Sequence, residues 1–267
     1  KGAQELKGLN IEISPFVCDN EEEQLAQLKE IADKGPNEYG GVITISFTRA
    51  SEVLMQFQRM LAKDMRVLVI DDHIETPEGL ISIPPREIQV GKVAAELAGL
   101  ITQGNGRILV SCGRKDSKIH EGRLESFCNY IKENKPELII ELVTGYTRNM
   151  NHRGELYKNA CEALDKYSDI CLIYALTSHD NRAFVEALEK HGKNKKVPII
   201  GTDLNEETLE FLKQKRMSAV IDQNPYDKGY MAFKIMVDCL IKNMSVPDVI
   251  PCRIDIALEN NADLCAD

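Results

Sequence analysis

Residues 197–224 show the organisation of this chain most clearly, and they read VPIIGTDLNEETLEFLKQKRMSAVIDQN. An apolar, β-branched run at 197–201 is followed by an amphipathic stretch at 205–215 and by a second apolar run at 218–221. Short continuous apolar runs are typical of strands that are buried on both faces of a parallel sheet. The segment therefore predicts a strand–helix–strand unit.

The same alternation extends through the rest of the chain. It predicts strands at 11–17, 42–47, 67–70, 107–112, 138–143, 170–175, 197–201, 218–221 and 250–257, and helices at 21–34, 50–63, 88–102, 118–134, 153–167, 180–191, 205–215 and 226–242. Nine strands exceed one compact doubly wound sheet. We therefore expect an α/β protein with two Rossmann-like, doubly wound parallel-sheet subdomains joined by a multi-stranded hinge.

The subdomain boundaries are expected where turn-forming residues interrupt the pattern. Gly104-Asn105-Gly106 separates a long helix from a new strand, and Asn224-Pro225 and Val246-Pro247-Asp248 mark two further crossings. The N-terminal subdomain would then comprise residues 1–105 and 225–247. The C-terminal subdomain would comprise residues 106–224 and 248–267.

Composition excludes several classes of protein. The 267 residues are 43% hydrophobic and 28% charged, and the net charge is -9. This apolar content excludes a disordered chain, and no apolar run reaches the roughly 20 residues of a membrane-spanning helix. An acidic chain repels phosphate backbones, so this segment by itself is not expected to bind nucleic acid.

Eight cysteines are scattered along the chain without C-x-x-C or zinc-finger spacing. A structural zinc site is therefore not expected. On balance we predict no metal site and no cofactor. An exported protein of this size seldom carries so many scattered thiols, because oxidation would scramble them. The cysteine content favours a cytoplasmic protein.

The familiar catalytic motifs are missing from the sequence. It contains no G-x-x-x-x-G-K-[ST], G-x-S-x-G or H-E-x-x-H. Asp71-Asp72-His73, at the end of a predicted strand, is a candidate metal or acid/base cluster, although strand ends often carry Asp in turns. His152 and His191 lie at predicted helix ends, where solvated side chains are the simpler interpretation. We expect a protein that is not an enzyme.

Polar residues follow four predicted strands of the C-terminal half. They are residues 120–123, 177–181, 202–203 and 222–224. Ligands of open α/β sheets bind beyond the carboxyl ends of the strands. Planar Asp, Asn, Gln and Arg side chains suit a polyhydroxylated ligand, because they form paired hydrogen bonds to adjacent hydroxyls. Each cluster alone is equally explained as a cap or turn, but together they favour a binding site.

Four motifs, in the right order, resemble a known family. They are Val90-Gly91-Lys92-Val93-Ala94-Ala95-Glu96-Leu97, Gly122-Arg123-Leu124-Glu125-Ser126-Phe127, Val197-Pro198-Ile199-Ile200-Gly201-Thr202-Asp203, and 218–225 with Gly229. The family is the effector-binding domain of LacI-type transcription regulators, which has the periplasmic binding protein type 1 fold. Ser126 stands where the family usually has glycine.

The resemblance implies a set of ligand-binding residues. Arg123 matches the arginine that binds effector hydroxyls, Asp203 the aspartate after the following strand motif, and Gln223 the glutamine at the crossover. His179 and Asp180 fall where the family usually has Asn-Asp, so His179 either replaces a polar contact or caps the strand end.

Two further positions are suggested less directly by the family pattern. Tyr146 falls near an aromatic residue that stacks on the ligand. Arg86 stands where the family commonly has Asp, five residues before Gly91. An arginine there favours a phosphorylated or acidic sugar, because its fork matches phosphate and carboxylate, or else it points to solvent.

The resemblance implies a bacterial, cytoplasmic ligand sensor that forms a homodimer. A small sugar or sugar derivative would bind in the cleft between the subdomains, and closure would be coupled to operator DNA. The family's first strand and its helix-turn-helix region would lie upstream of Lys1, and DNA would be bound only through that region. The alternative is an exported sugar-binding protein of an ABC transporter or a sensor kinase, with a signal peptide upstream.

Overall fold

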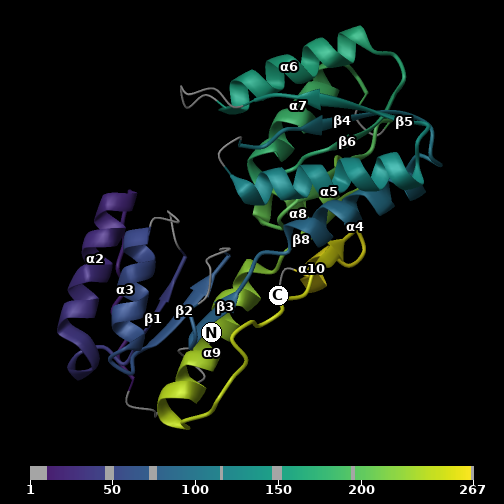
Figure 1. The fold of residues 1–267 in the computed structure, drawn as a ribbon. Coiled ribbons are helices and arrows are strands. Elements are labelled where there is room, and N and C mark those ends of the chain that lie inside the picture. The colour runs from purple at the N-terminus through teal and green to yellow at the C-terminus, as the bar shows by residue number, and fades with distance from the viewer. Residues whose placement is uncertain are drawn as a thin grey trace. The chain divides into compact units, whose positions relative to one another are not determined.

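The computed structural model describes residues 11–45, 51–71, 77–114, 117–145, 152–193 and 196–265, except for the side chains of His152 and Arg153. The chain forms two compact units (Figure 1). Unit 1 comprises Lys1–Pro85 and Pro225–Cys252, and unit 2 comprises Arg86–Asn224 and Arg253–Asp267. The predicted α/β class with two subdomains is confirmed.

The boundaries differ from the expected ones at two of the three crossings. Helix α4 (Glu87–Ile101) belongs to unit 2, because its buried face shares one core with Phe127 and Ile131 of α5 (Lys118–Asn134). The Gly104-Asn105-Gly106 turn therefore lies inside unit 2. The last crossing follows Cys252, since Cys252 packs in a core of unit 1.

Unit 1 contains a three-stranded parallel sheet in the order β1-β2-β3, formed by β1 (Gly41–Thr44), β2 (Arg66–Ile70) and β3 (Leu80–Ile83). Side chains of β2 alternate between two cores. Val67 and Val69 pack with α2 (Glu21–Lys34) and α3 (Ser51–Leu61), whereas Leu68 and Ile70 pack with α9 (Pro225–Ile241). Figure 1 shows α9, from late in the sequence, beside the early strands of this unit.

One strand prediction for unit 1 was wrong, and one strand was missed. Residues 11–17 form no strand, and Pro15 within them lacks the N–H that a sheet ladder requires. Strand β3 was missed, although Gly79 and Pro84-Pro85 bracket its short apolar run. The η1 turn (Gly35–Asn37) also had no counterpart among the predicted elements.

Unit 2 contains a six-stranded sheet in the order β5-β4-β6-β7-β8-β9. Its strands are β4 (Gly106–Ser111), β5 (Leu138–Val143), β6 (Ile170–Tyr174), β7 (Ile199–Thr202), β8 (Ala219–Asp222) and β9 (Asp255–Ala257). The first five are parallel, and β9 pairs antiparallel with β8. The long strand predicted at 250–257 is therefore only the short edge strand β9.

Helices cover both faces of this sheet. Ile108 and Val110 of β4 pack in the core that contains α4 and α5, whereas Leu109 packs in the core that contains α6 (His152–Lys166) and α7 (Asn181–Lys190). The second core also includes residues of α8 (Glu206–Lys213) and of the short α10 (Ala262–Cys265). The η2 turn (Ser178–Asp180) precedes α7. No helix in the described ranges is both long enough and apolar enough to cross a membrane.

One glycine fixes the distance between α4 and α5. A Cβ atom on Gly91 would lie 2.1 Å from Ser126 Oγ and 2.3 Å from the backbone oxygen of Arg123. Both separations are well inside van der Waals contact, so no residue with a side chain fits without movement of the helices. Gly91 thereby sets the position of α5, which carries Arg123.

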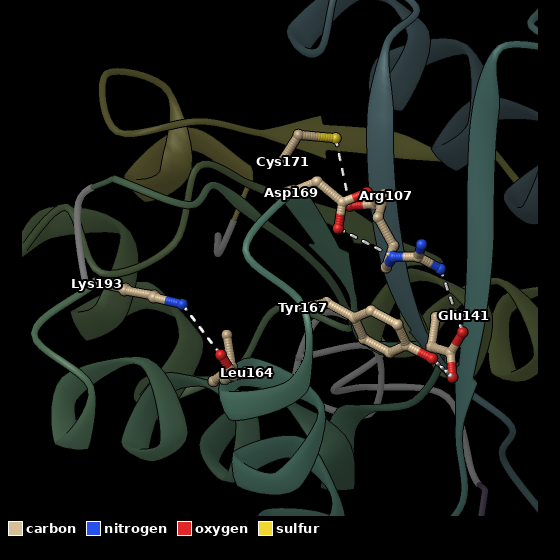
Figure 2. Close-up of polar contacts among 7 residues, drawn as sticks. All are labelled: Arg107, Glu141, Leu164, Tyr167, Asp169, Cys171 and Lys193. Atoms are coloured by element: carbon tan, nitrogen blue, oxygen red, sulfur yellow. Dashed lines mark hydrogen bonds and ion pairs between the residues drawn. The ribbon is translucent and has the colours of Figure 1, made fainter.

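A polar cluster ties the amino ends of β4 and β6 to the middle of β5 (Figure 2). Arg107 Nε donates to Asp169 Oδ1 at 3.1 Å, and Arg107 Nη1 donates to Glu141 Oε2 at 3.4 Å. The guanidinium carbon lies 4.0 Å from the ring centre of Tyr167, whose hydroxyl donates to Glu141. Arg107 and Asp169 lie at the opposite ends of β4 and β6 from the polar residues considered next.

Candidate functional site

The carboxyl ends of β4, β6, β7 and β8 bring polar residues together at one edge of the unit 2 sheet. We call these residues the unit 2 rim: Ser111, Asp180, Asp203, Asp222 and Gln223, with Arg123 of α5. Strands β4 and β6 are neighbours although β5 lies between them in sequence. The chain therefore reverses its winding direction here, which is where open α/β sheets bind ligands.

Arg123 is a buried cation. The residue is 3% exposed, and its Nη1 donates to the backbone oxygen of Leu176 at 2.6 Å. Its Nε–H is buried and has no hydrogen-bond partner among the described residues. Arginine stays charged at any ordinary pH, so this guanidinium is a fixed positive charge with donor capacity beyond its carbonyl anchor.

Two stacked aromatic rings lie in the same unit as Arg123. The rings of Phe127 and Tyr174 stack with their centres 4.8 Å apart. Burial raises the pKa of Tyr174 to about 12, although the positive charge of Arg123 acts in the opposite direction. The phenol of Tyr174 therefore stays neutral near neutral pH, within the electrostatic reach of Arg123.

Asp180 is a buried carboxylate that connects two segments of the unit 2 rim. The residue is fully buried, and its Oδ2 accepts hydrogen bonds from Ser111 Oγ at 2.6 Å and from the backbone N–H of Thr177 at 3.1 Å. The end of β4 is thereby joined to the segment that follows β6. His179, next to it, is exposed.

Asp203 and Gln223 are in direct contact. Gln223 Nε2 donates to Asp203 Oδ1 at 3.1 Å, although 20 positions separate the two residues in sequence. Asp203 has a φ of 63°, in the left-handed region, which turns the chain away from β7. A carboxylate next to a carboxamide offers both an acceptor and a donor to a sugar hydroxyl.

A second carboxylate lies beside this pair. Asp222 accepts hydrogen bonds from the backbone N–H groups of Leu204 and Asn224, at 3.0 and 3.1 Å. Burial raises the pKa of Asp222, with smaller contributions from the charges of Asp203 and Asp255, against the effect of the two N–H donors. In the part of the chain that the structure describes, no group of His, Cys, Asp and Glu residues could hold a metal ion.

Unit 1 carries an ion pair at the end of β2. Asp71 follows the strand with a φ of 53°, and its Oδ1 pairs with Nζ of Lys228 in the first turn of α9. Asp72 and His73, the other members of the predicted cluster, lie outside the described residues. Sequence reasoning missed Lys228, and the only signal was a cation at a helix N-terminus, where the helix dipole disfavours it.

Other sequence candidates fall away from these groups or outside the described residues. Arg86 is half-buried at the N-cap of α4, and its Nε is buried without a hydrogen-bond partner among the described residues, so it does not simply extend into solvent. His191 at the end of α7 lies 3.0 Å from Asp165 and serves as a helix-end contact. Tyr146 lies outside the described residues.

A groove of about 670 Å³ lies in unit 1, between residues 11–18, α2, β1 and α9. Its lining includes Leu28, Ile31, Val42, Met236 and Leu240. Polar residues also line this groove, among them Gln24, Gln27 and Glu38, and the polar groups of the unit 2 rim are not part of it.

The fold and the rim define a two-unit α/β protein of the ligand-binding class. A family model described as "Periplasmic binding protein domain" matches residues 2–243. The chain belongs to this family.

Individual relatives bind sugars. The D-allose-binding periplasmic protein of Escherichia coli (strain K12) is 23% identical over 253 residues, which cover 91% of this chain and 79% of the relative. A solute-binding protein of an ABC transporter from Actinobacillus succinogenes 130z, solved with bound D-allose, is similar with a TM-score of 0.83. It is 16% identical, and the match covers 98% of this chain and 92% of that chain.

A regulator shares the same fold. A candidate LacI transcriptional regulator from Bacteroides fragilis has a TM-score of 0.75 and 19% identity, with 92% of this chain and 83% of that chain covered. Likeness at this level of identity shows the fold, and both transport proteins and regulators are built on it.

Proposed function

We propose that this protein binds a sugar and hands it to a transporter or reports it to a membrane sensor. The proposal takes up the alternative from the sequence, because the relatives described above include a D-allose-binding periplasmic protein and an ABC transporter solute-binding protein solved with D-allose. The observation that carries it is the unit 2 rim, where buried Arg123 lies at the same sheet edge as the Asp203–Gln223 pair.

The rim side chains have complementary roles toward a sugar. Arg123 would donate to hydroxyl or ring oxygens, and Asp203 would accept from hydroxyls, each as a charge-assisted hydrogen bond. Gln223 would hold Asp203 in place, while Asp180 and Ser111 keep the ends of β4 and β6 in register. His179, Arg86 and Tyr146 remain proposed contributors to the same site.

Sugar binding would also involve unit 1. We retain the expectation that the ligand is enclosed between the two units and favours the arrangement that encloses it. Only a difference in affinity between the arrangements can produce such a shift. The relatives are named for binding rather than catalysis, and we propose no turnover of the ligand.

A second candidate is the effector-binding domain of a cytoplasmic LacI-type homodimer. Its specific support is that the eight cysteines form no disulfide, which suits a reducing compartment, and that a candidate regulator shares the fold. DNA would then be bound only by a helix-turn-helix outside this segment. The mass and N-terminal sequence of the protein isolated from its native cell distinguish the two functions. A basic helix-turn-helix upstream supports the regulator, and a cleaved signal peptide supports the binding protein.

Sugar binding itself is tested by thermal unfolding with D-allose, D-fucose, D-glucose, D-galactose and D-ribose, followed by calorimetry. We expect at least one of them to raise the melting temperature, and we expect Arg123→Met to abolish the increase. Lys132→Met on the same helix is the control, because Lys132 is exposed. Failure of all these sugars, or an unchanged response in Arg123→Met, would contradict the proposed site.

A further inference from the structure

The groove of unit 1 runs along an open edge of the three-stranded sheet. Within the described ranges β1 is an outer strand, which pairs with β2 on one side and with no strand on the other. The opposite edge of the sheet is covered, because the backbone of Ser82 in β3 pairs with residues 248–250. An open strand edge presents a row of backbone groups that can pair with a further strand. The groove therefore borders an edge at which this sheet can be extended.

Another wall of the groove has the sequence of a strand. Residues 11–16 line the groove, and the stretch 11–17 reads IEISPFV, which predicts a strand. It forms none, and residues 11–16 make no backbone–backbone hydrogen bond with another described residue. A strand requires a neighbour with which to form a ladder, and the groove separates this stretch from β1. The stretch therefore has the composition of a strand without the pairing.

The groove is apolar toward both layers of helices. Helix α2 packs on one face of β2 and helix α9 on the other. Leu28 of α2 and Met236 and Leu240 of α9 all line the groove. Ile43 of β1 is on the face covered by α9 but remains 36% exposed. An occupant of the groove would therefore meet apolar side chains above and below the plane of the sheet.

Two glutamines of α2 donate to carbonyl groups beside the two walls. Gln24 Nε2 donates to the backbone oxygen of Ile45, directly after β1, at 2.8 Å. Gln27 Nε2 donates to the backbone oxygen of Val17 at 2.8 Å. Carbonyl groups at a strand edge accept hydrogen bonds from the backbone N–H groups of a neighbouring strand. Side-chain amides here supply donors of the kind that a strand between the walls would supply.

We propose that one β-strand of the same polypeptide, encoded upstream of Lys1, inserts into this groove and pairs with β1 on one edge and with residues 11–17 on the other. Its side chains would alternate between the α2 layer and the α9 layer. They would be apolar at successive positions, as in strands buried on both faces. Residues 11–17 would become the outer strand, a position that tolerates Pro15.

The groove favours a strand of this polypeptide over one from a separate partner. A strand between residues 11–17 and β1 lies inside the sheet with helices on both faces, so it is enclosed as the unit folds. A separate partner more readily adds to an outer edge, and a tethered segment has a higher effective concentration. Residues 1–10 read KGAQELKGLN and contain no apolar run. The strand is therefore expected farther upstream.

Hydrogen exchange read by mass spectrometry tests the proposal. It compares the protein as its native cell makes it with a chain that begins at Lys1, in fragments that cover residues 11–18 and 41–45. We expect these amides to exchange roughly tenfold more slowly, or slower still, in the native protein, because a paired N–H exchanges only when the ladder opens. Equal rates in the two proteins, or a native protein that itself begins at Lys1, would overturn the proposal.

A substitution in the groove separates insertion from general stabilisation by upstream residues. Ile43→Lys should change the melting temperature of the chain from Lys1 by less than about 2 °C, since Ile43 is partly exposed there. It should lower that of the native protein by about 5 °C or more, because the inserted strand buries the new charge. Ile139→Lys, at an exposed position of β5, is the matched control and should have a small effect in both proteins. Equal effects of Ile43→Lys in the two proteins would contradict insertion.

The dependence on protein concentration identifies a different occupant. If protection of residues 41–45 in the chain from Lys1 increases with its concentration, a second copy supplies the strand, and a strand from the same polypeptide is wrong. Protection that is independent of concentration agrees with the proposal. Neither measurement uses a sugar, so failure of the proposed function and failure of strand insertion are distinguishable.

Discussion

Ser111 and Asp180 form a short relay at the carboxyl edge of the unit 2 sheet. Ser111 Oγ donates to Asp180 Oδ2 at 2.6 Å and accepts from the backbone N–H of Leu176 at 2.8 Å. The backbone oxygen of Leu176 in turn accepts from Arg123. A single hydroxyl therefore links the end of β4 to the residue that anchors the buried arginine.

Removal of the Ser111 hydroxyl should lower the stability of the folded protein. In Ser111→Ala the buried Asp180 carboxylate loses a donor and the Leu176 N–H loses its acceptor, which should lower the free energy of unfolding by about 1–3 kcal/mol. Urea denaturation measures this effect. Ser218→Ala, at an exposed position before β8, is the control and should change stability by less than about 0.5 kcal/mol. Equal effects of the two variants would show that the Ser111 hydroxyl does not make these two stabilising hydrogen bonds.

Asp203→Asn tests the charge of the Asp203–Gln223 pair. If the carboxylate accepts a sugar hydroxyl, the neutral amide should reduce the binding free energy by about 1.5–3 kcal/mol. Calorimetry with a sugar that binds the wild type gives the value directly. Gln214→Ala, on an exposed helix end away from the rim, should bind as the wild type does. Wild-type affinity in Asp203→Asn would remove this residue from the site.

Gly91→Ala should force α4 and α5 apart. The new methyl group would meet both Ser126 Oγ and the backbone oxygen of Arg123, so we expect a loss of about 1–3 kcal/mol in unfolding free energy. Adding Ser126→Gly should restore only part of this loss, because the backbone contact remains. Gly229→Ala in α9 is the matched control. Nothing lies within 4 Å of its added Cβ, and alanine favours helix by up to about 1 kcal/mol. Full rescue by Ser126→Gly would show that the backbone contact is relieved without cost.

The buried phenol of Tyr174 predicts an alkaline loss of stability. Its pKa is raised to about 12 in the folded state, from the ordinary tyrosine value of about 10, so the unfolded chain releases this proton first as the pH rises. Stability should therefore fall between about pH 10 and pH 12, by at most about 3 kcal/mol. The measurement is the difference in unfolding free energy between the wild type and Tyr174→Phe across this range. A difference between the two proteins that does not vary with pH would refute the raised pKa of Tyr174.

Much of the fold could be predicted because its signals are local. The eight predicted helices match α2 to α9 within a few residues, since each combines an apolar stripe with end signals such as Asn20, whose side chain accepts from the Glu23 N–H. The assignment of α4 to a unit could not be predicted in this way. That assignment depends on the contact between Gly91 and α5, which joins residues distant in sequence.

The candidate site was predictable in its residue types but not in its pairings. Asp203 and Gln223 could be placed at strand ends, and their contact follows from the adjacency of β7 and β8. By contrast, nothing local distinguishes Lys228 from Lys234, the exposed lysine of α9. Its burial depends on the end of β2, more than 150 positions away.

The antiparallel strand β9 has a consequence for synthesis on the ribosome. The outer edge of β8 acquires its partner only when residues 255–257 have been made, and one core of unit 1 waits for Ala232, Met236, Cys239 and Cys252. Both units therefore stay unfinished until nearly the whole chain has emerged. Nascent chains stalled before residue 225 should leave one apolar face of the unit 1 sheet and the backbone edge of β8 open to chaperones.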